Sequence, residues 1–114
     1  MNRRTELEAA QSILAKALQR ASESNTAQIT KLKIAIGEIA ELDRNLIQSQ
    51  WREICQGTPA EQAQLYFRLI TAEAQCMACF KTYHPEGGEI HCPHCGSFGA
   101  KILSGEEFYL EEIE

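Results

Sequence analysis

Two closely spaced cysteine pairs constrain this chain more than any other feature. Cys76 and Cys79 form one Cys-x-x-Cys motif, Cys92 and Cys95 form a second, and the twelve residues 80 to 91 separate them. Each motif places two sulfurs on one tight turn, and the intervening loop lets the second turn fold back over the first. Four thiolates at this spacing predict one tetrahedral Zn²⁺ per chain, with Zn–S bonds of about 2.3 Å.

A rubredoxin-like iron site, a redox dithiol pair and disulfides are the alternatives to zinc for these cysteines. Redox chemistry needs only one pair, so two pairs argue against a dithiol. A closed four-sulfur site has no open coordination position, and activation of a metal-bound water is therefore not expected. Gly96, directly after Cys95, suits the turn that ends the second motif because glycine permits a positive φ. We therefore predict a metal with a structural role.

Three histidines, His84, His91 and His94, lie inside or beside the cysteine-rich segment. Because four cysteines at good spacing complete a tetrahedral site, we expect these imidazoles to lie near the metal ligands or in solvent rather than to bind the metal. A transient second metal at His91 or His94 remains a hypothesis.

Charge is distributed unevenly along the chain, whose net charge is −5. Residues 1–75 carry nine basic and nine acidic side chains, whereas residues 76–114 carry two basic and seven acidic ones. A zinc-binding lobe that contacts nucleic acid needs clustered Lys and Arg, so this distribution argues against nucleic-acid binding. The chain has no apolar run long enough for a membrane span and no signal-peptide pattern, so we expect a cytoplasmic protein. Cys55 is then a reduced thiol, and we expect it to be a small core residue.

Two amphipathic helices are predicted in the first half of the chain. From Thr5 to about Ser22, apolar residues recur at steps of three and four, and Thr5 with Glu8 forms a capping-box pattern. Asp43 is expected to cap a second helix that stops at Gly57. The apolar residues of the two helices are Leu7, Ala10, Leu14, Ala17, Leu18 and Ala21, and then Leu46, Ile47, Trp51, Ile54 and Cys55.

Alternating apolar residues predict three strands, at residues 29–36, 63–70 and 107–113. Leu32, Ile34 and Ile36 should point inward in the first strand, Leu65, Phe67 and Leu69 in the second, and Phe108 and Leu110 in the third. The expected fold is α+β, with two helices on a three-stranded mixed sheet and a zinc-ribbon-like lobe inserted before the last strand. The α/β lobe would comprise residues 1–73 plus 103–114, and the zinc lobe residues 74–102.

Over nearly its full length, the chain resembles the HypA/HybF family of hydrogenase nickel-incorporation proteins. The resemblance depends on the order and spacing of short motifs rather than on any one of them. These are Glu6-Leu7 and Ala10-Gln11-Ser12-Ile13, Lys33-Ile34-Ala35-Ile36-Gly37-Glu38, Gly57-Thr58, the four cysteines, Cys95-Gly96-Ser97, and Ser104-Gly105-Glu106. The resemblance implies an α/β lobe that binds Ni²⁺ at its N-terminus and a structural zinc lobe. It also implies delivery of nickel to the large subunit of nickel-iron hydrogenase, usually with a partner GTPase, and in some organisms to urease.

The family's nickel site is the main departure from this pattern. Members of the family begin Met-His-Glu-Leu, and the histidine supplies an imidazole beside backbone nitrogen donors. Here the segment reads Arg4-Thr5-Glu6-Leu7, so Thr5 replaces the histidine, and Met1-Asn2-Arg3 precedes it. Glu6 is retained at the family position, but one carboxylate is a poor site for Ni²⁺, which favours nitrogen donors. We therefore predict weak or absent nickel binding there.

Two functions are consistent with these features. The first is a nickel metallochaperone for hydrogenase maturation, and the alternative is a zinc-stabilised adaptor of the same fold that has lost nickel delivery. An enzyme is not expected, because the metal site is closed and the sequence has no phosphate-binding glycine loop. The chain is expected to be a monomer or a dimer.

Overall fold

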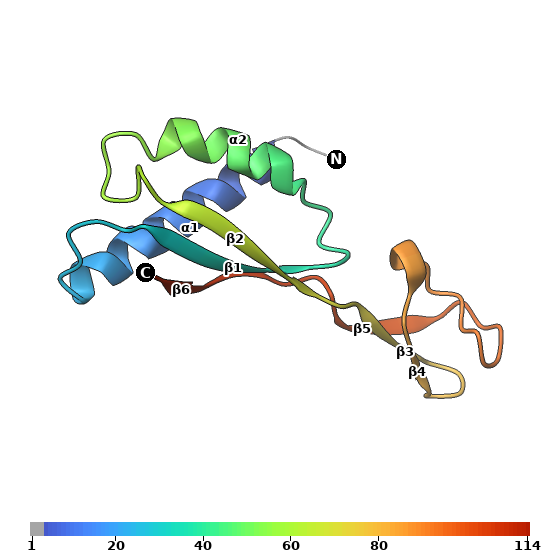
Figure 1. The fold of residues 1–114 in the computed structure, drawn as a ribbon. Helices are drawn as coiled ribbons and strands as arrows, with labels where there is room; N and C mark the ends of the chain where they lie inside the picture. Colours follow the sequence, from blue (N-terminus) through green and yellow to red (C-terminus); the bar gives the residue numbers. More distant parts are fainter. Residues whose placement is uncertain (1–3) are drawn as a thin grey trace.

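The computed structural model describes residues 4–114 and contains two small sheets that lie end to end (Figure 1). The first sheet has the strand order β2-β1-β6, and the second has the order β4-β3-β5. The Cα radius of gyration is 17.2 Å, whereas a single compact body of this length has about 13 Å. The chain is therefore elongated, with extents of 54 × 28 × 16 Å.

The first sheet is mixed, as the sequence predicts. β1 (Lys31–Gly37) pairs parallel with β2 (Gln64–Ile70) and antiparallel with β6 (Phe108–Ile113). Two helices, α1 (Arg4–Glu23) and α2 (Arg44–Ile54), cover one face of this sheet (Figure 1). The core between helices and sheet consists of Ile13, Ala17, Ala21, Ile29, Leu32, Ile34, Trp51, Cys55, Ala60 and Leu110.

Both helices form where their apolar periodicity places them. The Oδ1 atom of Asp43 accepts hydrogen bonds from the backbone N–H groups of Asn45 and Leu46, so the predicted cap of α2 is confirmed. Trp51 and Cys55 are buried, which confirms both as core residues. The first helix begins at Arg4, so Thr5 lies inside its first turn, and the surroundings of the Thr5 side chain lie outside what the structure describes.

Two side chains differ from the prediction in how far they are buried, although each lies on the expected face of the sheet. Ala35 alternates with the inward-pointing Ile34 and Ile36 and so lies on the open face of the sheet. It is nevertheless fully buried, because its strand neighbours Arg68 and Tyr109 cover that face. Leu69 was expected in the core but is 53% exposed. The partner of Leu69 across the ladder is Ile36, one residue before the end of β1.

The acidic C-terminal strand pairs with the cations of the open sheet face. Glu111 accepts a hydrogen bond from Arg68, and Glu112 lies 2.9 Å from the Nζ atom of Lys33. These contacts raise the pKa of Lys33 through its hydrogen bond to Glu112 and lower the pKa of Glu112. The carboxylates thus neutralise basic side chains that could otherwise contact phosphates.

The second sheet was not predicted as strands. It consists of β3 (Glu73–Cys76), β4 (Thr82–Tyr83) and β5 (Ala100–Ser104), and a 3-10 turn, η1 (Glu86–Gly88), follows β4. These strands have two to five residues, too few for an alternating pattern to stand out. The buried core of the second sheet comprises Ala74, Cys76, Tyr83 and Cys92. An apolar core of this size is too small to hold such a sheet by itself.

The two sheets meet where three chain segments cross in close contact. Gly37 ends β1, Gly105 lies between β5 and β6, and Ala72 lies between β2 and β3. A Cβ atom on Gly37 would lie 2.0 Å from the carbonyl oxygen of Gly105, and one on Gly105 would lie 2.7 Å from Ala72 Cα. The backbone N–H of Ile39 also donates to the Gly105 carbonyl at 2.8 Å. Only glycine fits at positions 37 and 105 without displacing backbone.

Candidate metal centre

Each cysteine motif is a tight turn closed by the same backbone hydrogen bond. The N–H of Phe80 donates to the carbonyl of Cys76 at 2.9 Å, and the N–H of Gly96 donates to the carbonyl of Cys92 at 2.9 Å. Both donors have positive φ, 63° at Phe80 and 81° at Gly96. The predicted turn at Gly96 is confirmed, and Phe80 adopts the same conformation in the first motif, where a non-glycine residue is uncommon.

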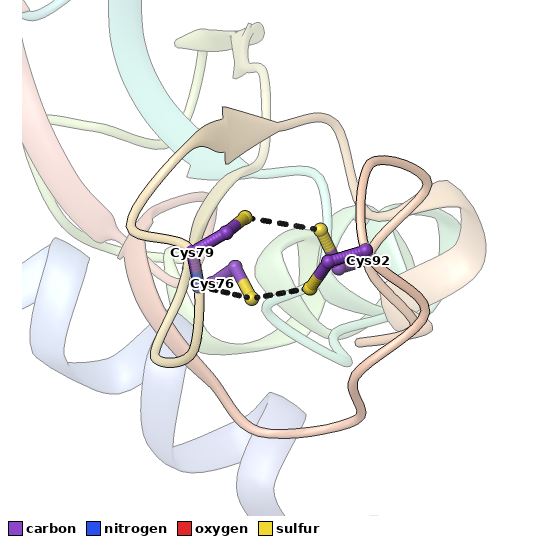
Figure 2. A group of neighbouring side chains, drawn as sticks. Cys76, Cys79 and Cys92 are labelled. Atoms are coloured by element: carbon purple, nitrogen blue, oxygen red, sulfur yellow. Dashed lines mark hydrogen bonds between the residues drawn. The ribbon is translucent and has the colours of Figure 1, made fainter.

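The four cysteine sulfurs converge on one point between the two turns (Figure 2). All four lie within 4.8 Å of one another. The Sγ atoms of Cys76 and Cys95 are 3.5 Å apart, and those of Cys79 and Cys92 are 3.8 Å apart. A tetrahedral site with Zn–S bonds of about 2.3 Å requires sulfurs about 3.8 Å apart. The cluster therefore fits a single metal ion, and the free thiols are not paired as disulfides.

Backbone N–H groups point at the sulfurs and favour their thiolate forms. Ala78 and Cys79 donate to the Sγ atom of Cys76 at 3.3 and 3.4 Å, and His94 donates from its backbone to Cys92 at 3.4 Å. The bonds from Cys79 and Ala78 lower the pKa of Cys76. A hydrogen bond from the Ser97 side chain lowers the pKa of Cys95 to about 6.

Four thiolates cannot coexist at these distances without a cation. The backbone N–H of Lys81 lowers the pKa of Cys79, but burial and the neighbouring sulfurs outweigh it and raise this pKa to about 11. Burial, followed by the charge of the cysteines, raises the pKa of Tyr83, which packs against the cluster. A divalent cation would neutralise this mutual repulsion, so the donor set fits a soft, thiolate-binding metal.

None of the three histidines belongs to this cluster among residues 4–114. His91 stacks on Phe98, with ring centroids 4.7 Å apart, and the His94 residue is exposed. His84 points away from the sulfurs toward the first sheet, where its Nε2 atom contacts Glu38. That these imidazoles do not bind the metal stays a prediction.

Glu38 joins the two sheets through two contacts. Its Oε1 atom accepts the backbone N–H of Ala72 at 2.8 Å, and its two oxygens lie 2.8 and 2.9 Å from the Nε2 atom of His84. The bond from Ala72, followed by that to His84, lowers the pKa of Glu38. The bond to Glu38 in turn raises the pKa of His84. Glu38 follows β1 and His84 follows β4. This pair therefore connects the first sheet, which carries the helices, to the second sheet, which carries the cysteines.

We expect the contribution of the Glu38–His84 pair to stability to depend on pH. The folded pKa of His84 is above its ordinary 6.5, so its contribution is complete below about pH 6.5 and is lost as pH rises through the folded pKa. The folded pKa of Glu38 is below its ordinary 4.5, so its contribution is complete above about pH 4.5 and is lost as pH falls through the folded pKa. Both are therefore fully present between about pH 4.5 and 6.5.

Amide hydrogen exchange of Ala72 between pH 6 and 8 tests this expectation, after correction for the intrinsic pH dependence of exchange. Protection of Ala72 should fall with rising pH in the native protein, and His84→Gln should abolish most of that dependence. His91→Gln is the matched control, because His91 contacts Phe98 and not Glu38. An unchanged pH profile in His84→Gln would show that the pair does not hold the two parts together.

Glu6 is far from the cysteines in sequence, and its carboxylate makes a hydrogen bond that connects the two helices. Glu6 is 3% exposed, and its Oε2 atom accepts the backbone N–H of Asp43 at 3.5 Å. Asp43 caps α2, so Glu6 joins the start of α1 to the start of α2. No histidine occurs before His84 in the sequence. The structure thus brings no imidazole to the position of Glu6.

Several residues at these sites were not recognised from the sequence. Phe80 has no glycine signature, although its position after the second cysteine of its motif matches that of Gly96. Ser97 follows the same motif and could have been noticed as a donor to Cys95. The pairing of Glu38 with His84 spans 46 positions, and nothing local signals it.

Comparison with known proteins gives a consistent result over the whole chain. A family model described as "Hydrogenase/urease nickel incorporation, metallochaperone, hypA" matches residues 5–114. The hydrogenase maturation factor HypA of Aquifex aeolicus is 31% identical over 104 residues, covering 91% of this chain and 90% of that protein. The protein of the same name from Caldanaerobacter subterraneus subsp. tengcongensis is 28% identical over 110 residues, covering 96% of each.

The fold is also similar to solved structures. The solution structure of the Ni metallochaperone HypA from Helicobacter pylori matches with a TM-score of 0.69 at 22% identity, covering 96% of this chain and 95% of that one. The expected arrangement of two helices on a mixed sheet, with a zinc-ribbon-like lobe before the last strand, is confirmed. No helix among residues 4–114 is long and apolar enough to cross a membrane.

Proposed function

Because the chain belongs to the HypA family of hydrogenase/urease nickel-incorporation proteins, we propose that it is a non-catalytic accessory protein that helps to insert nickel into nickel-iron hydrogenase. The match of the family model over residues 5–114 carries this proposal. The same match favours nickel delivery over the alternative of an adaptor that has lost it. The partners would be the hydrogenase large subunit and a nickel maturation GTPase, in the cytoplasm.

The resident metal of the four-cysteine cluster is, on this proposal, one structural Zn²⁺ held by Cys76, Cys79, Cys92 and Cys95. The sulfur distances and the closed, four-sulfur donor set support zinc. The division into an α/β lobe, residues 1–73 plus 103–114, and a zinc lobe, residues 74–102, belongs to the same proposal. The zinc would hold the second sheet in one conformation and so fix the surface it offers to a partner.

Nickel is the cargo, and this chain supplies few donors for it at the family position. The Glu6 carboxylate is buried and engaged with the Asp43 backbone, and Thr5 stands in the place of the histidine. Oxygen donors alone bind Ni²⁺ more weakly than sites that include imidazole. We therefore propose that the chain completes a nickel site with donors from a partner instead of holding nickel tightly by itself.

Titration of Ni²⁺ into the zinc-loaded protein tests the cargo proposal. We expect no stoichiometric binding at micromolar affinity to the chain alone, and we expect Thr5→His to strengthen binding because it restores an imidazole donor. Glu8→Ala is a control in the same helix, outside the retained Glu6 position. Micromolar or tighter binding by the native chain that Glu6→Ala abolishes would contradict the proposal.

Deletion of the gene tests the wider function. Hydrogenase activity should fall in the deletion strain, and excess nickel in the medium should restore it. A strain with normal hydrogenase and urease activities at limiting nickel would contradict a role in nickel insertion.

A further inference from the structure

Phe80 holds a backbone conformation that its residue type disfavours. It ends the first cysteine turn with a φ of 63°, whereas glycine, Gly96, has the equivalent position in the second turn. A positive φ strains a bulky residue, and glycine adopts it freely. Burial does not compensate for this strain, because Phe80 is 63% exposed. A strained residue that adds little to a core indicates a role for its side chain at the surface.

Three exposed apolar side chains lie together around this turn. Met77 is in the same turn as Phe80, and its backbone N–H donates to the Gly99 carbonyl at 3.0 Å, which brings Phe98 beside it. Met77 and Phe98 are 52% and 68% exposed, and the Phe98 ring stacks on His91. Met77, Phe80 and Phe98 are called the apolar patch below. Methionine and aromatic residues of this kind are enriched in protein interfaces.

Two unpaired cations border the apolar patch. Lys81 and Lys101 are the two lysines among residues 74–102, which contain no arginine. Lys81 follows Phe80 directly. Lys101 pairs across the second sheet with Gln75, whose side-chain N–H donates to the Phe80 carbonyl at 3.2 Å. Among the described side chains, no carboxylate forms an ion pair with either lysine. The surface around the patch is therefore complementary to negative charge.

The backbone of the first cysteine turn has no N–H group left for a partner. Met77 donates to the Gly99 carbonyl, the next two residues donate to the Cys76 sulfur, and Phe80 donates to the Cys76 carbonyl. A partner therefore cannot pair with this turn as a further strand. It has to bring a backbone whose hydrogen bonds are already satisfied, as those of an α-helix are.

We propose that the apolar patch docks an amphipathic helix of a partner protein, with an apolar stripe bordered by carboxylates. The apolar stripe would cover Met77, Phe80 and Phe98, and the carboxylates beside it would meet Lys81 and Lys101. A methionine and two rings on turns can adjust to such a stripe. The docking requires the two cysteine turns to be formed, but it does not depend on nickel.

Fluorescence anisotropy of a labelled peptide, measured with the zinc-loaded full chain, tests the proposal. The probe is a helix of about 20 residues, with leucines at steps of three and four and glutamates beside them. We expect it to bind, and we expect at least about tenfold weaker binding in Phe80→Gly and in Phe98→Ser, since each removes an anchor. Tyr109→Ser is the matched control, because Tyr109 is also an exposed aromatic residue but lies on the first sheet.

Charge reversal tests the border of the apolar patch. Lys81→Glu combined with Lys101→Glu should abolish binding of the glutamate peptide. The same double variant should bind a peptide in which lysines replace the glutamates.

The melting temperature of Phe80→Gly tests the argument from strain. It should rise, because glycine adopts the positive φ without strain, so stability and peptide binding should change in opposite directions. A lower melting temperature with unchanged peptide binding would show that Phe80 is needed for folding and would overturn the proposal.

Other results would assign the apolar patch to a different occupant and so overturn the proposal. Equal binding of the glutamate and lysine peptides by the native chain would exclude an acidic partner, and native affinity in Phe98→Ser would exclude the patch. Binding to vesicles of neutral and anionic phospholipid that only Phe98→Ser abolishes, without peptide binding, would indicate a lipid surface. Self-association that Phe98→Ser abolishes would indicate a second copy of the chain.

Discussion

Removal of the metal with a strong chelator is expected to unfold the second sheet while the first sheet stays folded. The second sheet has a buried core of four residues, two of which are the cysteines Cys76 and Cys92. Structural zinc contributes an apparent binding free energy of about 10 to 16 kcal/mol at neutral pH, and a core this small cannot replace it. The first sheet has a separate core around Trp51 and should keep it.

Hydrogen exchange and Trp51 fluorescence distinguish the two parts. Chelation should remove the protection of Ala74 and Cys76 and leave the fluorescence of Trp51 unchanged. Cys92→Ser should have the same effect without chelator, and Cys55→Ala is the control, because Cys55 is buried in the first core and lies outside the sulfur cluster. Retention of the second sheet in metal-free protein would show that the metal has no structural role.

Gly37→Ala is expected to destabilise the protein by more than about 3 kcal/mol, which is large for one methyl group. The new Cβ would lie 2.0 Å from the carbonyl oxygen of Gly105, so the backbone at the crossing would have to separate. This movement would also strain the nearby hydrogen bond from Ile39 to Gly105 and the bond from Gly37 to Glu107. These bonds connect the end of β1, and the residues just after it, to the segment that leads into β6.

Urea unfolding of the zinc-loaded protein, followed through Trp51, measures this effect. Gly99→Ala is the matched control, because its new Cβ would meet only Met77 Cβ, at 4.0 Å, and its φ is not positive. We expect the Gly99 variant to change stability by less than about 1 kcal/mol. Equal stabilities of the two variants would mean that the close crossing at Gly37 is not required.

Much of the fold follows from local patterns that the sequence displays. The periodicity of α1 and α2, the Asp43 cap and the alternation at Leu32, Ile34 and Ile36 all predicted elements that the structure contains. The cysteine motifs likewise predicted a metal cluster, since their spacing needs only two tight turns and one loop. These features depend on residues close together in the chain.

Other features could not be predicted, because they depend on which segments meet. Ala35 is buried only because Arg68 and Tyr109 lie on either side of it. Leu69 is exposed although its alternation matches that of Phe67. The two glycine motifs at Gly37 and Gly105 were noticed separately, but their contact decides why neither tolerates a side chain.

The sequence by itself determined the secondary structure of the first sheet and its two helices, and the convergence of four cysteines. It also indicated that the chain belongs to a nickel-incorporation family and that this chain lacks the family's usual histidine. Only the tertiary structure decided how the two sheets are joined, through the glycine crossing and the Glu38–His84 pair, and which apolar side chains gather around Phe80. The physical reason is the separation along the chain of the residues that make each feature. Periodicity and turn motifs act over a few residues, whereas a crossing, a cross-sheet ion pair or a surface patch exists only after segments far apart in the chain have come together.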